Sequence, residues 1–317
     1  MANDSEAMEW HLGHIVRNAK NKIIEWNIGD AIDTKKVEKH RECATLLRET
    51  FPDSPYAHLR EKVTLFKETV ANLWNPKADS AEIKQIVDSL PLMLDGTLSA
   101  LRAYDDRTSH ALSRRFGKNS HEVLNFKESL SSEYDNEFAY RFMYKLRNYS
   151  QHCGVPELSG GVRGYLSEGG EIHKDVSITF DSLKLVDRYD GWGKKVRQEL
   201  LEIDGEFDAI ETVNRMMLSC SRTYGKLLIA RNHELADAAE YILSLDASPE
   251  GTEYVPALFG LRPTEWLNED AESEKNWSLA FVRVDLALLL DIALKDASTV
   301  LNYPRISGQP PVLPNDG

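Results

Sequence analysis

Residues 147–152 read RNYSQH, so an arginine, two amides and a histidine lie close together in the chain. A histidine titrates near neutral pH, and the imidazole of His152 can therefore move protons under physiological conditions. Arg147 stays charged and can hold phosphate oxygens with a planar pair of donors, while Asn148 can orient a phosphate or a hydroxyl. These groups are the minimum set for cleaving an RNA strand without a metal ion. His152 would assist attack of the 2′-hydroxyl or protonate the leaving oxygen, and Arg147 would stabilise charge on the phosphorus.

The helix expected to carry these residues has one apolar and one polar side. At about 100° per residue, its apolar stripe contains Phe138, Phe142, Leu146, Tyr149 and Cys153. The polar side contains Arg147, Asn148, Gln151 and His152, and it extends to Glu137, Tyr140, Arg141 and Tyr144. We expect the stripe to pack in the core and the polar side to face solvent near the helix end.

This motif resembles the Arg-x(4–6)-His signature of the HEPN superfamily, in its common form with a polar residue directly after the arginine. HEPN domains are helical bundles, and many are metal-independent endoribonucleases of toxin–antitoxin, abortive-infection and CRISPR systems. The resemblance implies that Arg147, Asn148 and His152 are catalytic and that Tyr144, Gln151 and Tyr140 support them. It covers about residues 80–245 and leaves both ends of the chain unexplained.

The resemblance also implies partners. The substrate would be RNA, such as tRNA or mRNA, and the setting would be a toxin or an antiviral defence system. The second acid/base group is missing from the motif, and a homodimer would supply it by placing two motif helices face to face. An antitoxin or regulatory protein is a further expected partner. We expect no cofactor and no metal, because no pair of histidines has ligand spacing with a carboxylate on one helix face.

A purely structural role is the alternative for the same residues. The dipole at a helix C-terminus favours cations, so Arg147 and His152 would then only stabilise the end of their helix. Asn148 and Gln151 would be solvated surface residues. In that case the chain would be a non-catalytic HEPN-like module that scaffolds a partner or binds a nucleotide.

The bare spacing of the motif also occurs elsewhere in the chain. Arg114 and Arg115 precede His121 at distances that fit the signature, but Gly117 and an expected helix break lie between them. We therefore do not expect Arg114 and Arg115 to share a helix face with His121.

The elements that must position the motif are expected to be mainly helical, because apolar residues recur every three or four positions. The expected helices cover residues 5–26, 34–51, 56–74, 80–116, 120–153, 193–219, 222–245 and 286–301. We expect Asp79 and Ser80 to cap the fourth helix, and Pro91 to break or kink it. The helix over residues 120–153 is either one long helix or two abutting ones. A small β element is expected near residues 174–182 and 254–284.

Three regions follow from this pattern. Residues 1–79 are expected to form an N-terminal helical region, and residues 80–248 a HEPN-like helical domain with a Gly-rich and β insertion at 159–190. Residues 249–317 would form an acidic α+β region, with an acidic loop over residues 265–275 and a flexible tail.

The charge of the chain limits how it can contact RNA. The net charge is −13, from 38 basic and 51 acidic residues, which argues against a broad phosphate-binding surface. Residues 200–317 hold 9 basic and 20 acidic residues, whereas residues 100–160 hold 9 and 8. A local RNA site around the motif therefore remains compatible with the charge.

The composition also indicates a cytoplasmic protein. Mean hydropathy is −0.43, and no membrane association is expected. The N-terminus lacks the basic start and apolar run of a signal peptide. Cys43, Cys153 and Cys220 form no Cys-x-x-Cys pair, which favours a reducing compartment.

Overall fold

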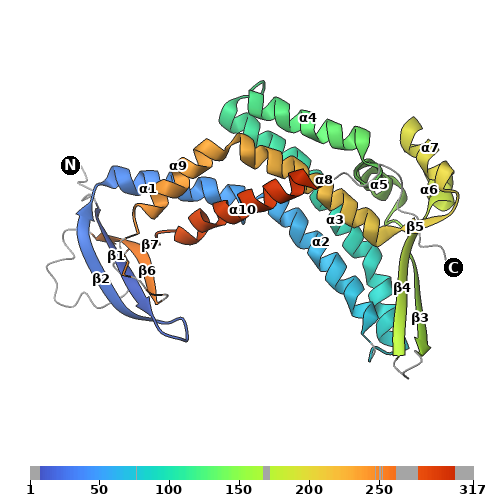
Figure 1. Ribbon diagram of the computed structural model, residues 1–317, viewed down its shortest axis with the longest axis horizontal. Coiled ribbons are helices and arrows are strands. Elements are labelled where there is room, and N and C mark those ends of the chain that lie inside the picture. The colour runs from blue at the N-terminus through green and yellow to red at the C-terminus, as the bar shows by residue number, and fades with distance from the viewer. Residues whose placement is uncertain are drawn as a thin grey trace, which may run out of the picture. The chain divides into compact units, whose positions relative to one another are not determined.

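The computed structural model describes residues 8–75, 77–166, 172–246, 248–249, 251, 253–261 and 278–303. Over these residues the chain is mainly helical and has small antiparallel sheets, as the sequence predicts (Figure 1). It divides into two compact units. The first combines the residues up to Asp53 with Arg231–Lys295, and the second combines Ser54–Ala230 with the residues from Asp296 on. None of the described helices has the length and apolar content needed to traverse a bilayer.

The first unit is built on an antiparallel sheet in the order β2-β1-β6-β7. Its strands are β1 (Glu9–Arg17), β2 (Ile23–Ile32), β6 (Tyr254–Leu261) and β7 (Ser278–Phe281). Strand β1 pairs with both β2 and β6, so segments from the N-terminal and C-terminal thirds of the chain share one sheet. The unit also contains α1 (Thr34–Thr50), α9 (Asn232–Leu243) and the first part of α10 (Val284–Asn302). Helices α1 and α9 pack together, and the Tyr241 hydroxyl donates to the Lys36 carbonyl oxygen at 2.9 Å.

The helix expected over residues 5–26 is wrong, whereas the other two helices of the expected N-terminal helical region, over 34–51 and 56–74, are present. The described part of this segment is the β1–β2 hairpin. Asn18 builds its turn by accepting hydrogen bonds from the backbone of Lys20 and Lys22, and Asn21 has a φ of 62°. The apolar spacing fits a helix locally, but pairing of β1 with two neighbours satisfies its backbone groups and overrides that local preference.

The second unit is a helical bundle with a three-stranded sheet in the order β3-β4-β5. Its helices are α2 (Pro55–Ala71), the 3-10 helix η1 (Asn72–Trp74), α3 (Ser80–Phe116), α4 (His121–Asn136), α5 (Phe138–Cys153), α6 (Ser182–Arg188), α7 (Lys194–Ile203) and α8 (Ala209–Ala230). Its strands are β3 (Ser159–Leu166), β4 (Ile172–Asp181) and β5 (Glu206–Asp208). Both strand regions expected from the sequence thus contain strands.

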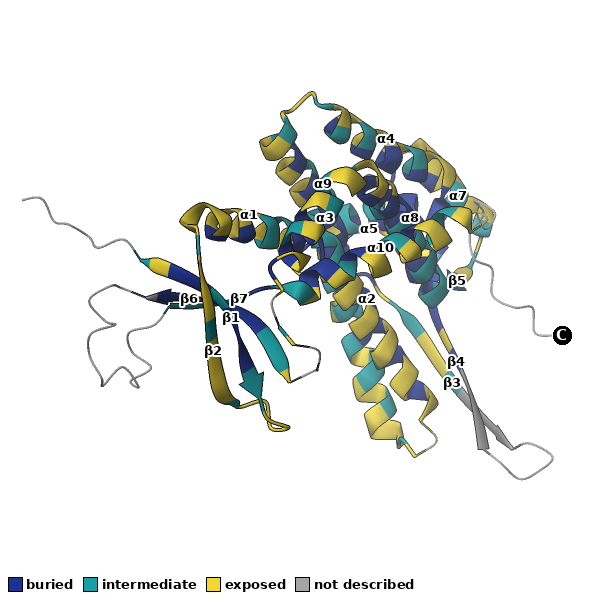
Figure 2. Ribbon diagram, turned by 60° about the vertical axis from the view of Figure 1, so that its left-hand side comes forward, coloured by how far each residue is buried: buried dark blue, intermediate teal, exposed yellow. Residues whose placement is uncertain are grey.

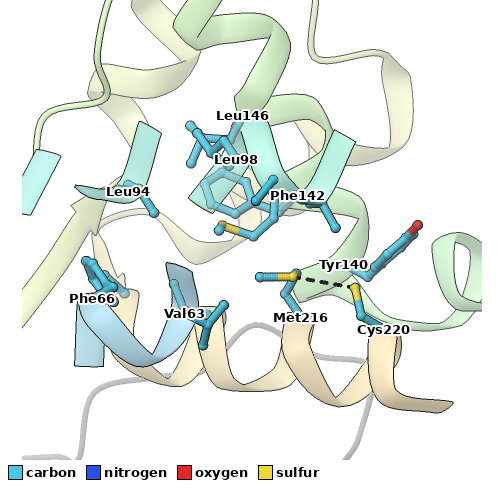
Figure 3. Close-up of a cluster of buried hydrophobic side chains, with 14 of the residues drawn as sticks. Val63, Phe66, Leu94, Leu98, Tyr140, Phe142, Leu146, Met216 and Cys220 are labelled. Atoms are coloured by element: carbon cyan, nitrogen blue, oxygen red, sulfur yellow. Dashed lines mark hydrogen bonds between the residues drawn. The ribbon is translucent and has the colours of Figure 1, made fainter. Parts of the chain in front are cut away.

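Apolar side chains from α2, α3, α5 and α8 form the core of this bundle. Figure 3 shows part of this cluster, with labels on Val63, Phe66, Leu94, Leu98, Phe142, Leu146 and Met216. The helices that contribute to the core carry buried and exposed residues on different sides (Figure 2). This packing buries the apolar stripe expected on α5, except at its last residue.

Helix α3 bears on two expectations, its capping box and the effect of Pro91. The Asp79 carboxylate accepts hydrogen bonds from the backbone of Ala81 and Glu82, and the Glu82 side chain accepts one from the Asp79 backbone. The expected capping box is therefore present. Of the break or kink expected at Pro91, the break is absent, because α3 continues from Ser80 to Phe116. Leu90 and Leu94 are fully buried on either side of the proline, so core packing offsets the lost backbone hydrogen bond.

Several boundaries differ from those expected. The segment 120–153 forms two helices with Glu137 between them, which was one of the two alternatives. Helix α8 continues through the gap expected at 219–222 and ends at Ala230. Along the sequence, the chain passes from one unit to the other at 53/54, 230/231 and 295/296, whereas the expected regions were divided at 79/80 and 248/249. The expected acidic loop 265–275 and most of the tail lie outside the described residues.

Candidate functional site

Helix α5 is buried where it begins and exposed where it ends. All residues from Phe138 to Met143 are buried, because α3, α4 and α8 pack around this half of the helix. Arg147 and Asn148 are half-buried, and Gln151 and His152 are exposed. The last two turns of α5 therefore present the predicted catalytic residues to solvent.

Buried ion pairs fix the first half of α5. Arg141 donates to the Glu199 carboxylate of α7, with an Nε–Oε2 distance of 3.0 Å, and to the Tyr134 carbonyl oxygen. Arg222 of α8 donates from Nη2 to Oε2 of Glu133 at 2.6 Å, and the same nitrogen lies 3.2 Å from Oε1 of Glu137. Buried charges such as these are tolerated only when they are paired, so the contacts hold α4, α5, α7 and α8 in one arrangement.

Polar contacts also hold the exposed end of α5. The Ser150 hydroxyl donates to the Asp95 carboxylate of α3. Gly154 ends the helix with a φ of 92°, and its N–H donates to the Ser150 carbonyl oxygen at 3.2 Å. The Cys153 thiol lies 3.4 Å from the Arg188 carbonyl oxygen, which links α5 to the last residue of α6. Residues of the last turn thus project from a fixed backbone.

The predicted catalytic residues have few partners of their own. The Arg147 guanidinium donates to the Gln151 side chain one helical turn later. The His152 imidazole stacks on Tyr189, with 6.0 Å between ring centres and 16° between ring planes. In the described part of the chain, neither the Asn148 amide nor a ring nitrogen of His152 makes a hydrogen bond. Their polar atoms are therefore available to a ligand.

Tyr140 does not lie on the exposed face predicted for it. It is 2% exposed and belongs to the buried cluster that contains Phe142 and Cys220 (Figure 3). Burial raises the pKa of its hydroxyl far above the ordinary value, so Tyr140 cannot exchange protons with a substrate. The predicted supporting role of Tyr140 is incompatible with this position.

Tyr144 is a residue of α5, and its side chain contacts α3. Its hydroxyl accepts a hydrogen bond from Arg102, whose guanidinium also lies 5.5 Å from the centre of the Tyr144 ring. Arg102 further pairs with Asp105 at 3.5 Å and with Asp106 at 2.9 Å. Tyr144 is thus engaged by Arg102, and its contacts join two helices of the bundle.

The sequence did not single out Tyr189 as the residue that contacts His152. Tyr189 follows α6, and its ring packs edge-on against Tyr149 and Trp192. A weak signal was present, because aromatic residues interleaved with Gly191 and Gly193 predict a loop packed on a core. The sequence could not show which helix that loop would meet.

Comparison with protein-family models, with curated proteins and with solved structures found no match to this chain. Among the described residues, no group of three or more His, Cys, Asp and Glu side chains is placed to hold a metal ion.

Proposed function

We propose that the exposed end of α5 is the active site of a HEPN-like, metal-independent endoribonuclease. One observation carries the proposal: Arg147, Asn148 and His152 reach solvent together from the end of a helix whose first half is anchored in the core. A guanidinium, an amide and an imidazole on a fixed backbone can hold and cleave a phosphodiester.

The reaction would proceed by attack of the 2′-hydroxyl oxygen on the adjacent phosphorus. The new O2′–P bond forms as the bond from phosphorus to the 5′-oxygen breaks, which leaves a 2′,3′-cyclic phosphate and a 5′-hydroxyl. His152 either accepts the 2′-hydroxyl proton or donates a proton to the 5′-oxygen. Arg147 stabilises the charge on the phosphoryl oxygens, and Asn148 orients them. The other proton transfer falls to a group from a second copy of the chain, which makes a homodimer the expected active form.

RNA cleavage in EDTA tests this proposal. The full chain should cleave total RNA and leave 2′,3′-cyclic phosphate ends, whereas Arg147→Ala and His152→Ala should lose the activity. His121→Ala is the matched control, because His121 begins α4 and Gly117 separates it from Arg114 and Arg115 of α3. The proposal is wrong if the full chain does not cleave RNA, or if all variants cleave it equally.

A non-catalytic interaction module is the second candidate. It is favoured because Arg147 and Tyr144 already have structural partners within the same unit. Arg147 donates to Gln151, and the Tyr144 hydroxyl accepts from Arg102. In that case, a protein partner or a nucleotide would bind and RNA would not be cleaved, and His152→Ala would leave the growth of expressing cells unchanged. Toxicity that His152→Ala relieves would favour the nuclease instead. The biological setting we propose for the nuclease is a toxin or phage-defence system, with an antitoxin or regulatory protein as partner.

A further inference from the structure

We infer that Tyr189 is the positioning residue of His152, an inference that rests on the proposed function of this site. The exposed imidazole lies almost parallel to the Tyr189 ring, 6.0 Å from it between centres. Aromatic rings interact favourably when offset-stacked at about 4.5–7 Å. An exposed histidine at a helix end is otherwise free to change rotamer, so this contact restricts the orientation of the imidazole.

The stacking contact orients the imidazole without occupying its nitrogens. Catalytic histidines are commonly oriented by a hydrogen bond to one ring nitrogen, which leaves the other for the reaction. Neither nitrogen of His152 makes a hydrogen bond within the described residues. Both can therefore face a substrate or a group from a second copy of the chain, while Tyr189 supplies the orientation.

Tyr189 is itself held by buried aromatic residues. Its ring meets Tyr149 edge-on at 5.8 Å and Trp192 edge-on at 5.6 Å between centres. Trp192 is fully buried, and its indole N–H donates to the Leu185 carbonyl oxygen at 2.9 Å. Tyr149 belongs to α5 and stacks on Trp192. The Tyr189 ring thus rests on the same core that fixes α5, and it can hold His152 in a constant place relative to Arg147.

Gly191 provides the space for the Tyr189 ring. A Cβ at this position would lie 2.2 Å from the Tyr189 hydroxyl oxygen and 2.3 Å from its Cζ atom. The φ of Gly191 is outside the left-handed range, so its backbone would accept an alanine. Gly191→Ala is therefore expected to displace the Tyr189 ring and to leave the backbone unchanged.

The test combines NMR of the His152 ring protons with RNA cleavage by the full chain. In the wild type, the ring current of Tyr189 should shift the imidazole resonances. Tyr189→Leu should abolish that shift and slow cleavage by about 10- to 100-fold, since misplacing a catalytic group by about 1 Å can cost that much. Tyr189→Phe should retain both the shift and the activity. Gly191→Ala should behave like Tyr189→Leu, whereas Gly205→Ala, with no atom within 4 Å of its Cβ, should behave like the wild type.

The outcomes separate this inference from the proposed function. If the wild type cleaves RNA but Tyr189→Leu changes neither the resonances nor the rate, the inference is overturned. Equal loss of activity in Tyr189→Phe and Tyr189→Leu would also overturn it, because the hydroxyl and not the ring would then matter. If the wild type cleaves no RNA but Tyr189→Leu still removes the shift, the proposed function fails and the positioning contact stands.

Discussion

His40 is a buried histidine that lacks hydrogen bonds. It lies in α1, is 3% exposed, and neither ring nitrogen has a hydrogen-bond partner among the described residues. Burial lowers its pKa from the ordinary 6.5, and the positive charge of Arg41 lowers it further. The folded protein therefore keeps this imidazole neutral at pH values where the unfolded chain binds a proton.

This difference predicts how the stability of the first unit depends on pH. Between the lowered pKa and 6.5, the unfolded state binds more protons than the folded state, so the free energy of unfolding decreases as the pH decreases. The contribution of His40 is at most about 1.4 kcal/mol for each pH unit in that window. We expect His40→Leu to reduce the loss of stability between pH 7.5 and pH 5.5.

Hydrogen exchange of the α1 and β1 amides measures this effect in the first unit alone. His233→Leu is the control, because His233 is exposed on α9 of the same unit. An equal loss of protection at acidic pH in the wild type and in His40→Leu would show that His40 does not contribute.

The residues of α5 show which features of the candidate site can be predicted from the sequence. The helical wheel correctly placed Arg147, Asn148, Gln151 and His152 near solvent, because their half of α5 borders solvent. It misplaced Glu137, Tyr140 and Arg141, which are buried, since a wheel treats all turns of a helix alike and α5 is surrounded by other helices at its beginning. The contact with Tyr189 joins residues 37 apart in the sequence, and no local pattern predicts it.

At the scale of elements, the change in stability caused by Gly13→Ala distinguishes a helix from the β1–β2 hairpin. A Cβ at Gly13 would lie 2.0 Å from the Asn27 carbonyl oxygen and 3.0 Å from the Phe259 ring. In the hairpin, Gly13→Ala is therefore expected to destabilise the first unit by about 1–3 kcal/mol, as other overpacked sites do. In a helix, the same change would stabilise by about 1 kcal/mol. Urea unfolding of the variant measures the sign.

Gly96 gives the matched control for this prediction. It lies inside α3, and a Cβ there would have no atom within 4 Å. Gly96→Ala should therefore stabilise the second unit by about 1 kcal/mol, which is the ordinary gain in a helix. If Gly13→Ala stabilised the protein as Gly96→Ala does, the hairpin would be the wrong structure for residues 9–32.

The start of α3 could be predicted from the sequence, whereas the β1–β2 hairpin could not. The Asp79 cap of α3 is a local signal, and it predicts the start of the helix correctly. The hairpin depends on the pairing of β1 with β6, whose residues are more than 200 positions away. Apolar residues at 12, 15 and 16 fit the period of a helix, and only the pairing of their segment shows that they belong to a strand.

For the whole molecule, the negative charge belongs mainly to the first unit. That unit has 13 basic and 23 acidic residues, whereas the second unit has 25 and 28. The RNA site proposed at the end of α5 lies in the second unit, where the charges nearly balance. The acidic unit should repel the phosphate backbone, so RNA would be held at a few positions around Arg147 and not along a broad surface.

This distribution predicts that RNA binding depends weakly on salt. Each phosphate neutralised in a single strand contributes about −0.7 to the slope of log K against log salt concentration. We expect a total slope of about −1 to −2 for single-stranded RNA, measured with His152→Ala so that the RNA is not cleaved. Adding Arg147→Ala should reduce the slope by about 0.7, whereas adding Lys20→Ala, in the exposed turn of the first unit, should leave it unchanged. A slope of about −4 or steeper would instead require a broad basic surface, and the site at α5 would then not account for RNA binding.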